Sequence, residues 1–137
     1  MTNSTFSNFE SETTATFTED LILNGYGLIA IALENIIDDA ENADIISCEE
    51  ALLSSEIIAA ATGNAAHDFP GDLMEWMHTH IPQGSAEHAS LLEMREKAAD
   101  AIDNIVTKSE LRELWEDTNS FSEWFDAQVA LQKRILE

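Results

Sequence analysis

Hydrophobic residues recur along most of the chain with the three- to four-residue period of an α-helix. The clearest stripe begins at Leu28 and uses positions 28, 29, 32, 33, 36, 37 and 40. Glu34, Asp38 and Glu41 fall opposite this stripe, so the segment has one apolar and one acidic face. No segment sustains the two-residue alternation of a half-buried strand. The pattern therefore predicts helices throughout.

The predicted helix starts are marked by Ser or Thr followed three residues later by Glu, the spacing of a capping box. This spacing occurs at Ser7 with Glu10, Ser47 with Glu50, Thr107 with Glu110, and Ser120 with Glu123. Together with the Gly and Pro breaks, it predicts helices at about 9–23, from 28 onward, at 48–62, 70–79 and 85–106, and after Thr107 and Ser120. We expect an all-α, compact bundle of six to seven helices, with a polar N-terminal segment at 1–8 and a single all-helical domain at 9–137.

Composition agrees with a folded domain. The chain has 137 residues, 45% of them hydrophobic, which is enough apolar surface for one core despite a net charge of −21. Cys48 is the single cysteine, so no intrachain disulfide can form and a reducing compartment is favoured. The N-terminus lacks the pattern of a signal peptide, and the longest apolar run, 28–33, is too short to span a membrane. We expect a cytoplasmic protein.

The charge is distributed unevenly. Residues 1–94 contain 17 Asp or Glu and no Lys or Arg, and all six basic residues follow from Arg95 onward. Direct binding to nucleic acid or to an anionic membrane needs clustered basic residues, so neither is expected. A basic protein partner is the class that this charge favours.

Two segments resemble a bacterial family catalogued as domain of unknown function 4259. They are Phe9-Glu10 followed by Phe17 and Leu21, and the run 109–115 followed by Trp124. The resemblance covers about residues 6–136 and implies a small helical protein, but it carries over no catalytic residue. Relatives have a Gly and Trp turn before the Phe-Glu step, where this chain has Ser4-Thr5-Phe6-Ser7-Asn8. Trp115 and Trp124 match the family pattern, and their spacing predicts core positions.

Candidate chemistry is sparse. Glu75 and His78 form a Glu-x-x-His step on one helix face, but a di-iron bundle needs two such steps and the sequence contains no second one. Cys48 follows a predicted helix start but is next to two glutamates, which oppose thiolate formation, so a small, partly buried cysteine without a catalytic role is favoured. We therefore predict no catalytic residue, no metal site and no cofactor. A metal-binding protein or an enzyme of unknown reaction centred on Glu75 and His78 is kept as an alternative.

The function favoured by these observations is a non-enzymatic, acidic protein-binding module, such as an immunity protein or an inhibitor that neutralises a basic partner, for example a nuclease toxin. A DNA mimic that blocks a nucleic-acid-binding protein is a second alternative. Whether the acidic surface serves binding at all, only maintains solubility or reflects adaptation to salt stays open. The oligomeric state and the partner's identity stay open. The predicted partner-binding residues are the acids near one end of the domain: Glu34, Asp38, Asp39, Glu41, Asp44, Glu49 and Glu50.

Overall fold

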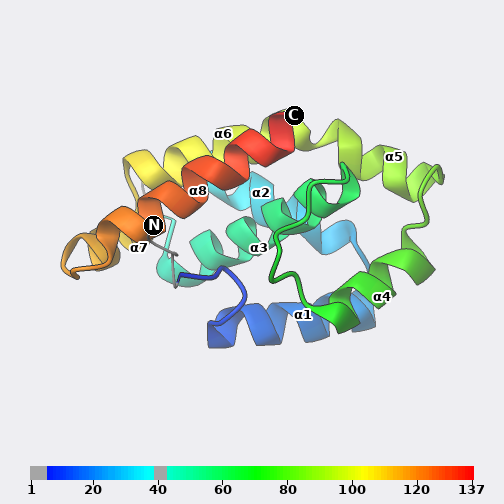
Figure 1. The fold of residues 1–137 in the computed structure, drawn as a ribbon, viewed down its shortest axis with the longest axis horizontal. Coiled ribbons are helices and arrows are strands. Elements are labelled where there is room, and N and C mark those ends of the chain that lie inside the picture. Colours follow the sequence, from blue (N-terminus) through cyan, green and yellow to red (C-terminus); the bar gives the residue numbers. More distant parts are fainter. Residues whose placement is uncertain (1–5, 39–42) are drawn as a thin grey trace.

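The protein is an all-α bundle, as the sequence predicts. The computed structural model describes residues 6–38 and 43–137, and within these ranges it has eight helices and no strand (Figure 1). The helices are α1 (Glu12–Asn24), α2 (Gly27–Asp38), α3 (Ile45–Ala61), α4 (Gly71–His80), α5 (Ala86–Glu93), α6 (Arg95–Thr107), α7 (Glu110–Glu116) and α8 (Phe121–Leu136). Within the described ranges, no helix is long and apolar enough to cross a membrane.

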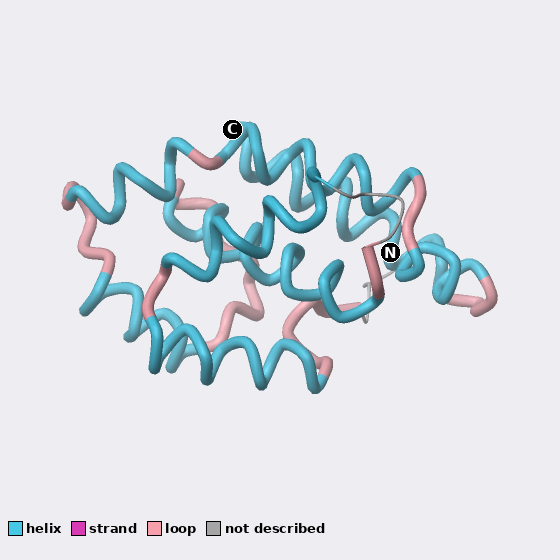
Figure 2. The backbone as a smooth tube through the Cα atoms, turned by 180° about the vertical axis from the view of Figure 1, so that it is seen from behind, coloured by secondary structure: helices cyan, strands magenta, loops and turns pink. Residues whose placement is uncertain are grey.

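Helix α3 lies at the centre of the bundle. It contacts α1, α2, α5, α6, α7 and α8, and Figures 1 and 2 show it between a layer containing α6 and α8 and a layer containing α1 and α4. Because neighbours surround it, almost every residue from Ala51 to Ala61 is buried. A helix that is apolar on all sides is the type that fills the core of a bundle.

Most helix starts lie a few residues from the predicted capping boxes. Helix α1 begins after Ser11, whose side chain accepts a hydrogen bond from the Thr14 amide, and not after Ser7. Ser7 Oγ instead accepts from the Phe9 amide. The predicted start of α1 at about Phe9 was wrong. Asn8 bonds to Glu56 and Gln128, and Phe9 packs edge-on against Phe69 with ring centroids 5.4 Å apart, so both residues make tertiary contacts before the helix begins.

The starts of α3 and α7 were also misplaced. Asp44 caps α3 by accepting a 2.7 Å hydrogen bond from the Ser47 amide, so Ser47 lies inside the first turn. Ser109, two residues after the predicted Thr107, caps α7 by accepting from the Arg112 amide. Several Ser, Thr and Asp residues compete at each of these sites, and each can satisfy the unpaired amides of a helix start.

The segment predicted as one long helix from Ser85 to about Val106 is divided in two. Ser85 caps α5 as predicted, accepting from the His88 amide. Met94 then leaves helical geometry at φ −89° and ψ 3°, and α6 starts at Arg95. This break lets α5 pack on α3 while α6 packs on α2, α3 and α8, and it accounts for the eighth helix.

Candidate functional site

The predicted acidic residues that the structure describes lie on α2 and at the start of α3. Glu34 is exposed on α2, and its carboxylate is 4.0 Å from Lys97 Nζ. Asp38 is exposed at the last position of α2. Asp44 is exposed as the α3 cap. Asp39 and Glu41 lie outside the described residues.

Glu49 and Glu50 follow on the first turns of α3, and both are partly buried. The pKa of Glu50 is raised, first by burial and then by the nearby carboxylates of Asp44 and Asp20. Asp20 lies on α1, so acids from two helices repel one another at this end of the bundle. The fold holds these like charges close together, where they repel one another. A bound cationic ligand would relieve this repulsion.

Beside Glu49 the surface is hollowed. This aromatic hollow, of about 310 Å³, is lined among others by Phe6, Trp115 and Trp124, and by the carboxyl-bearing residues Glu10, Glu49 and Glu123. The six residues come from the N-terminal segment, α3, α7 and α8. No Lys, Arg or His contributes to the lining.

The rings of the aromatic hollow form one packed cluster. Phe6 meets Trp115 edge-on at 5.2 Å, and Trp115 stacks on Trp124 at 6.5 Å with an angle of 10° between the ring planes. Trp124 is fully buried, as the sequence predicts, and its Nε1 has no acceptor among the described residues. Trp115 is only partly buried, so its ring contacts the core through Trp124 and also lines the hollow.

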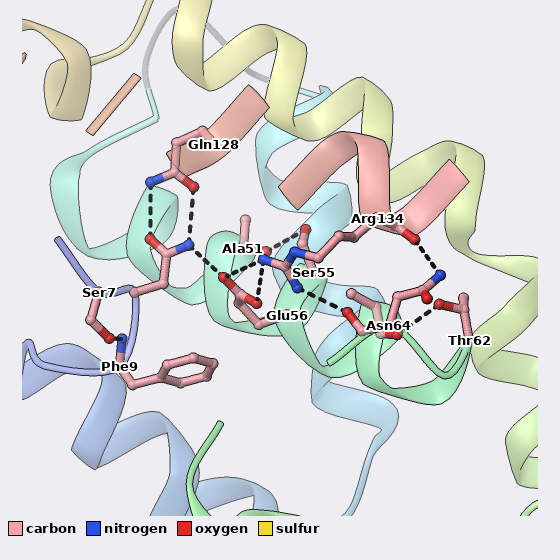
Figure 3. Close-up of polar contacts among 11 residues, drawn as sticks. Ser7, Phe9, Ala51, Ser55, Glu56, Thr62, Asn64, Gln128 and Arg134 are labelled. Carbon is pink, nitrogen blue, oxygen red and sulfur yellow. Dashed lines mark hydrogen bonds and ion pairs between the residues drawn. The ribbon is translucent and has the colours of Figure 1, made fainter. Parts of the chain in front are cut away.

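A polar network links the N-terminal segment, α3 and α8 through side chains that are buried or partly buried (Figure 3). Glu56 is 3% exposed, and its carboxylate accepts hydrogen bonds from Arg134 Nη2 at 3.1 and 3.4 Å. Asn8 Nδ2 donates to Glu56 Oε2 at 2.8 Å and to Gln128 Oε1 at 3.0 Å, while Gln128 Nε2 donates back to Asn8 Oδ1. Arg134 also donates to the Asn64 carbonyl at 3.1 Å.

This network ties the N-terminal segment to α3 and α8. Burial is the largest influence on Glu56 and raises its pKa, while Arg134 and the Asn8 hydrogen bond act in the opposite direction and Asp68 adds to the increase. A second hollow, of about 600 Å³, opens beside Glu56 and includes His67 and Asp68 in its lining. Because every polar group of the network bonds to another one, we interpret it as a structural lock.

The other sequence candidates are separate from these hollows. Glu75 and His78 are both exposed on α4, and the described residues contain no group of three His, Cys, Asp or Glu side chains suited to holding a metal ion. Cys48 is fully buried, deeper than the partly buried position expected from the sequence, and burial raises the pKa of its thiol to about 11. Such a thiol carries almost no thiolate at neutral pH.

Sequence reasoning missed the network and the hollow for different reasons. Glu56 could have been singled out from the sequence, because it is the one acidic residue in the mainly apolar run 51–61 of α3. Its partners Asn8 and Arg134 are 48 and 78 residues away along the chain, and no local pattern relates them. The two tryptophans were assigned only to the core.

The structure defines the class of the protein: it is a small all-α protein with an acidic, aromatic hollow in its surface. The family model described as Domain of unknown function (DUF4259) matches residues 5–127, so the chain belongs to this family. No curated protein and no solved structure matches the chain.

Proposed function

We propose that this protein is a non-enzymatic binding module that captures a basic protein partner, in the manner of an immunity protein or an inhibitor of a basic effector. The observation that carries the proposal is the position of the aromatic hollow beside the acidic start of α3. Glu49 belongs to both features. A surface that combines aromatic anchors with an excess of carboxylates is suited to the recognition of a basic protein.

The use of the basic side chains supports the same proposal. Arg134 is bound to Glu56, and Arg112 pairs with Glu116 at 3.3 Å. Lys97 approaches Glu34 on the side of α2. These three cations already interact with carboxylates of the same chain. The acidic residues still outnumber the basic ones, so a large net negative charge faces an external partner. A partner of opposite charge gains fast, steered association from such a field.

The proposal is tested by isolating the partner and rebuilding the complex. The tagged protein is used to capture interacting proteins from cells that carry its gene, and the retained proteins are identified by mass spectrometry. The leading basic candidate is then purified and mixed with the protein, and the mass of the complex is measured by light scattering. We expect a defined complex that dissociates as salt rises. A purified candidate that forms no complex at low salt would contradict the proposal.

A further inference from the structure

The aromatic hollow differs in charge from two other hollows of the described residues. The hollow beside Glu56 includes Arg134 and His67 in its lining, and a third hollow includes Arg95, His78 and His88. The aromatic hollow has carboxylates and ring faces with no positive group among its lining residues. Ring faces and carboxylates both attract cations, so the chemistry of this site favours a positively charged side chain with some apolar surface.

An arginine of the chain already lies over one ring of this aromatic cluster. The guanidinium carbon of Arg112 lies 5.1 Å from the centroid of Phe121, and the ring of Phe121 lies 5.8 Å from that of Trp124. Trp124 in turn stacks on Trp115. One end of the aromatic cluster is therefore already covered by an arginine of this protein, while the other end lines the aromatic hollow.

We infer that the aromatic hollow takes the side chain of one arginine of the basic partner, an inference that rests on the proposed function. A guanidinium is planar and weakly hydrated, so it stacks on an aromatic face and donates paired hydrogen bonds to a carboxylate. A lysine ammonium is a compact, strongly hydrated point charge, and it loses more hydration in a half-apolar hollow. Glu10 and Glu49 supply the carboxylates.

The walls of the hollow are held in place before any ligand arrives. Phe6 precedes Ser7 and Asn8, and the Asn8 amide is fixed by Glu56 and Gln128. Trp124 is fixed in the core at 0% exposure. A site whose walls are already ordered loses little conformational entropy when it binds. This arrangement gives the buried network a role in recognition as well as in stability.

The inference is tested with three short peptides that differ at one position. They are acetyl-Gly-Arg-Gly-amide, its lysine counterpart and its citrulline counterpart, which keeps the shape of arginine without the charge. Binding is followed by NMR through the indole N–H signals of the three tryptophans. We expect the arginine peptide to shift the signals of Trp115 and Trp124, and to leave that of Trp76, which is on α4 and outside the lining of the hollow, unchanged.

The expected affinity order is arginine, then lysine, then citrulline, with arginine roughly fivefold to tenfold tighter than citrulline. The Glu49→Gln variant should weaken arginine binding severalfold. The matched control Glu75→Gln removes the same charge from an exposed position on α4 and should leave binding unchanged. Circular dichroism verifies that both variants are folded.

The outcomes separate this inference from the proposed function. Equal binding of arginine and citrulline, or equal weakening by Glu49→Gln and Glu75→Gln, would overturn the arginine site. The proposed function would then be judged separately, from the rebuilt complex and its dependence on salt. A rebuilt complex that forms but is unaffected by Glu49→Gln overturns the arginine site alone. Arginine-selective shifts that are lost in Glu49→Gln support it.

Discussion

Glu56 is the residue at which burial and charge compete most directly. Its carboxylate is almost fully buried and is paired with Arg134, yet its pKa is raised, so burial outweighs the attraction of the guanidinium. A pair of this kind contributes little net stability compared with an apolar pair, but removing one partner leaves the other uncompensated. We expect Glu56→Ala to lower the free energy of unfolding by about 3 kcal/mol, measured by chemical denaturation.

The raised pKa of Glu56 also predicts how stability depends on pH. The folded state holds the proton of Glu56 more tightly than the unfolded chain, so the contribution of this residue is fully present below the ordinary pKa of 4.5. It declines as the pH rises through the raised folded value. Glu56→Gln cannot titrate, so the free energy of unfolding of the wild type minus that of Glu56→Gln should fall as the pH is raised from about 4.5 toward neutral. A difference that grows with pH would show that Arg134 dominates.

At the scale of elements, α3 connects the core to the acidic surface. Its middle is buried by six other helices, while its first turns carry Asp44, Glu49 and Glu50 at the surface. Asp44 is therefore both a predicted partner-binding acid and the N-terminal cap of the central helix. Reversing its charge to test binding would also disturb folding, so Glu49 is the better position for a binding test.

The contribution of the Asp44 cap to stability can be tested with two variants that carry the same charge. Asp44→Ala and Asp44→Asn remove the same charge, but an Asn side chain still accepts a hydrogen bond from the Ser47 amide. We expect Asp44→Ala to cost about 1 kcal/mol more than Asp44→Asn in the free energy of unfolding. Urea denaturation of the two variants measures this difference. Equal stabilities would mean that the cap hydrogen bond contributes nothing.

The helices could be predicted from the sequence because their apolar period is local. The stripe of α2, with Ile29, Leu33 and Ile36 buried, is visible in any window of the sequence. The exact starts were harder, since Ser7 has the capping-box spacing, whereas Ser11 lacks it and yet caps α1. The choice between them depends on Asn8, whose partners lie 48 and 120 residues away. The aromatic hollow depends on four segments that meet only in the folded chain.

At the scale of the whole molecule, the dominant property is a net charge of −21. The described ion pairs include Glu56 with Arg134 in the interior, and Glu34 with Lys97 and Arg112 with Glu116 at more exposed positions. Exposed pairs contribute little to stability. The remaining carboxylates repel one another, and this repulsion opposes the compact state.

Added salt should therefore stabilise the protein. Screening shortens the range of charge repulsion to about 10 Å at 0.1 M ionic strength, so we expect the melting temperature to rise between low and moderate sodium chloride. Differential scanning calorimetry measures this directly. A melting temperature that stays constant or falls would show that the carboxylates are spaced widely enough to avoid repulsion.

We propose that the acidic surface around the aromatic hollow captures a basic protein. The most direct test of this proposal is the association rate of the rebuilt complex, measured by stopped-flow tryptophan fluorescence over a range of salt concentrations. We predict a rate above roughly 10⁵–10⁶ M⁻¹s⁻¹ at low salt that falls steeply as salt increases. Glu49→Gln should reduce affinity more than the charge-matched Glu75→Gln. A rate independent of salt, with the wild type and both variants binding alike, would contradict the account.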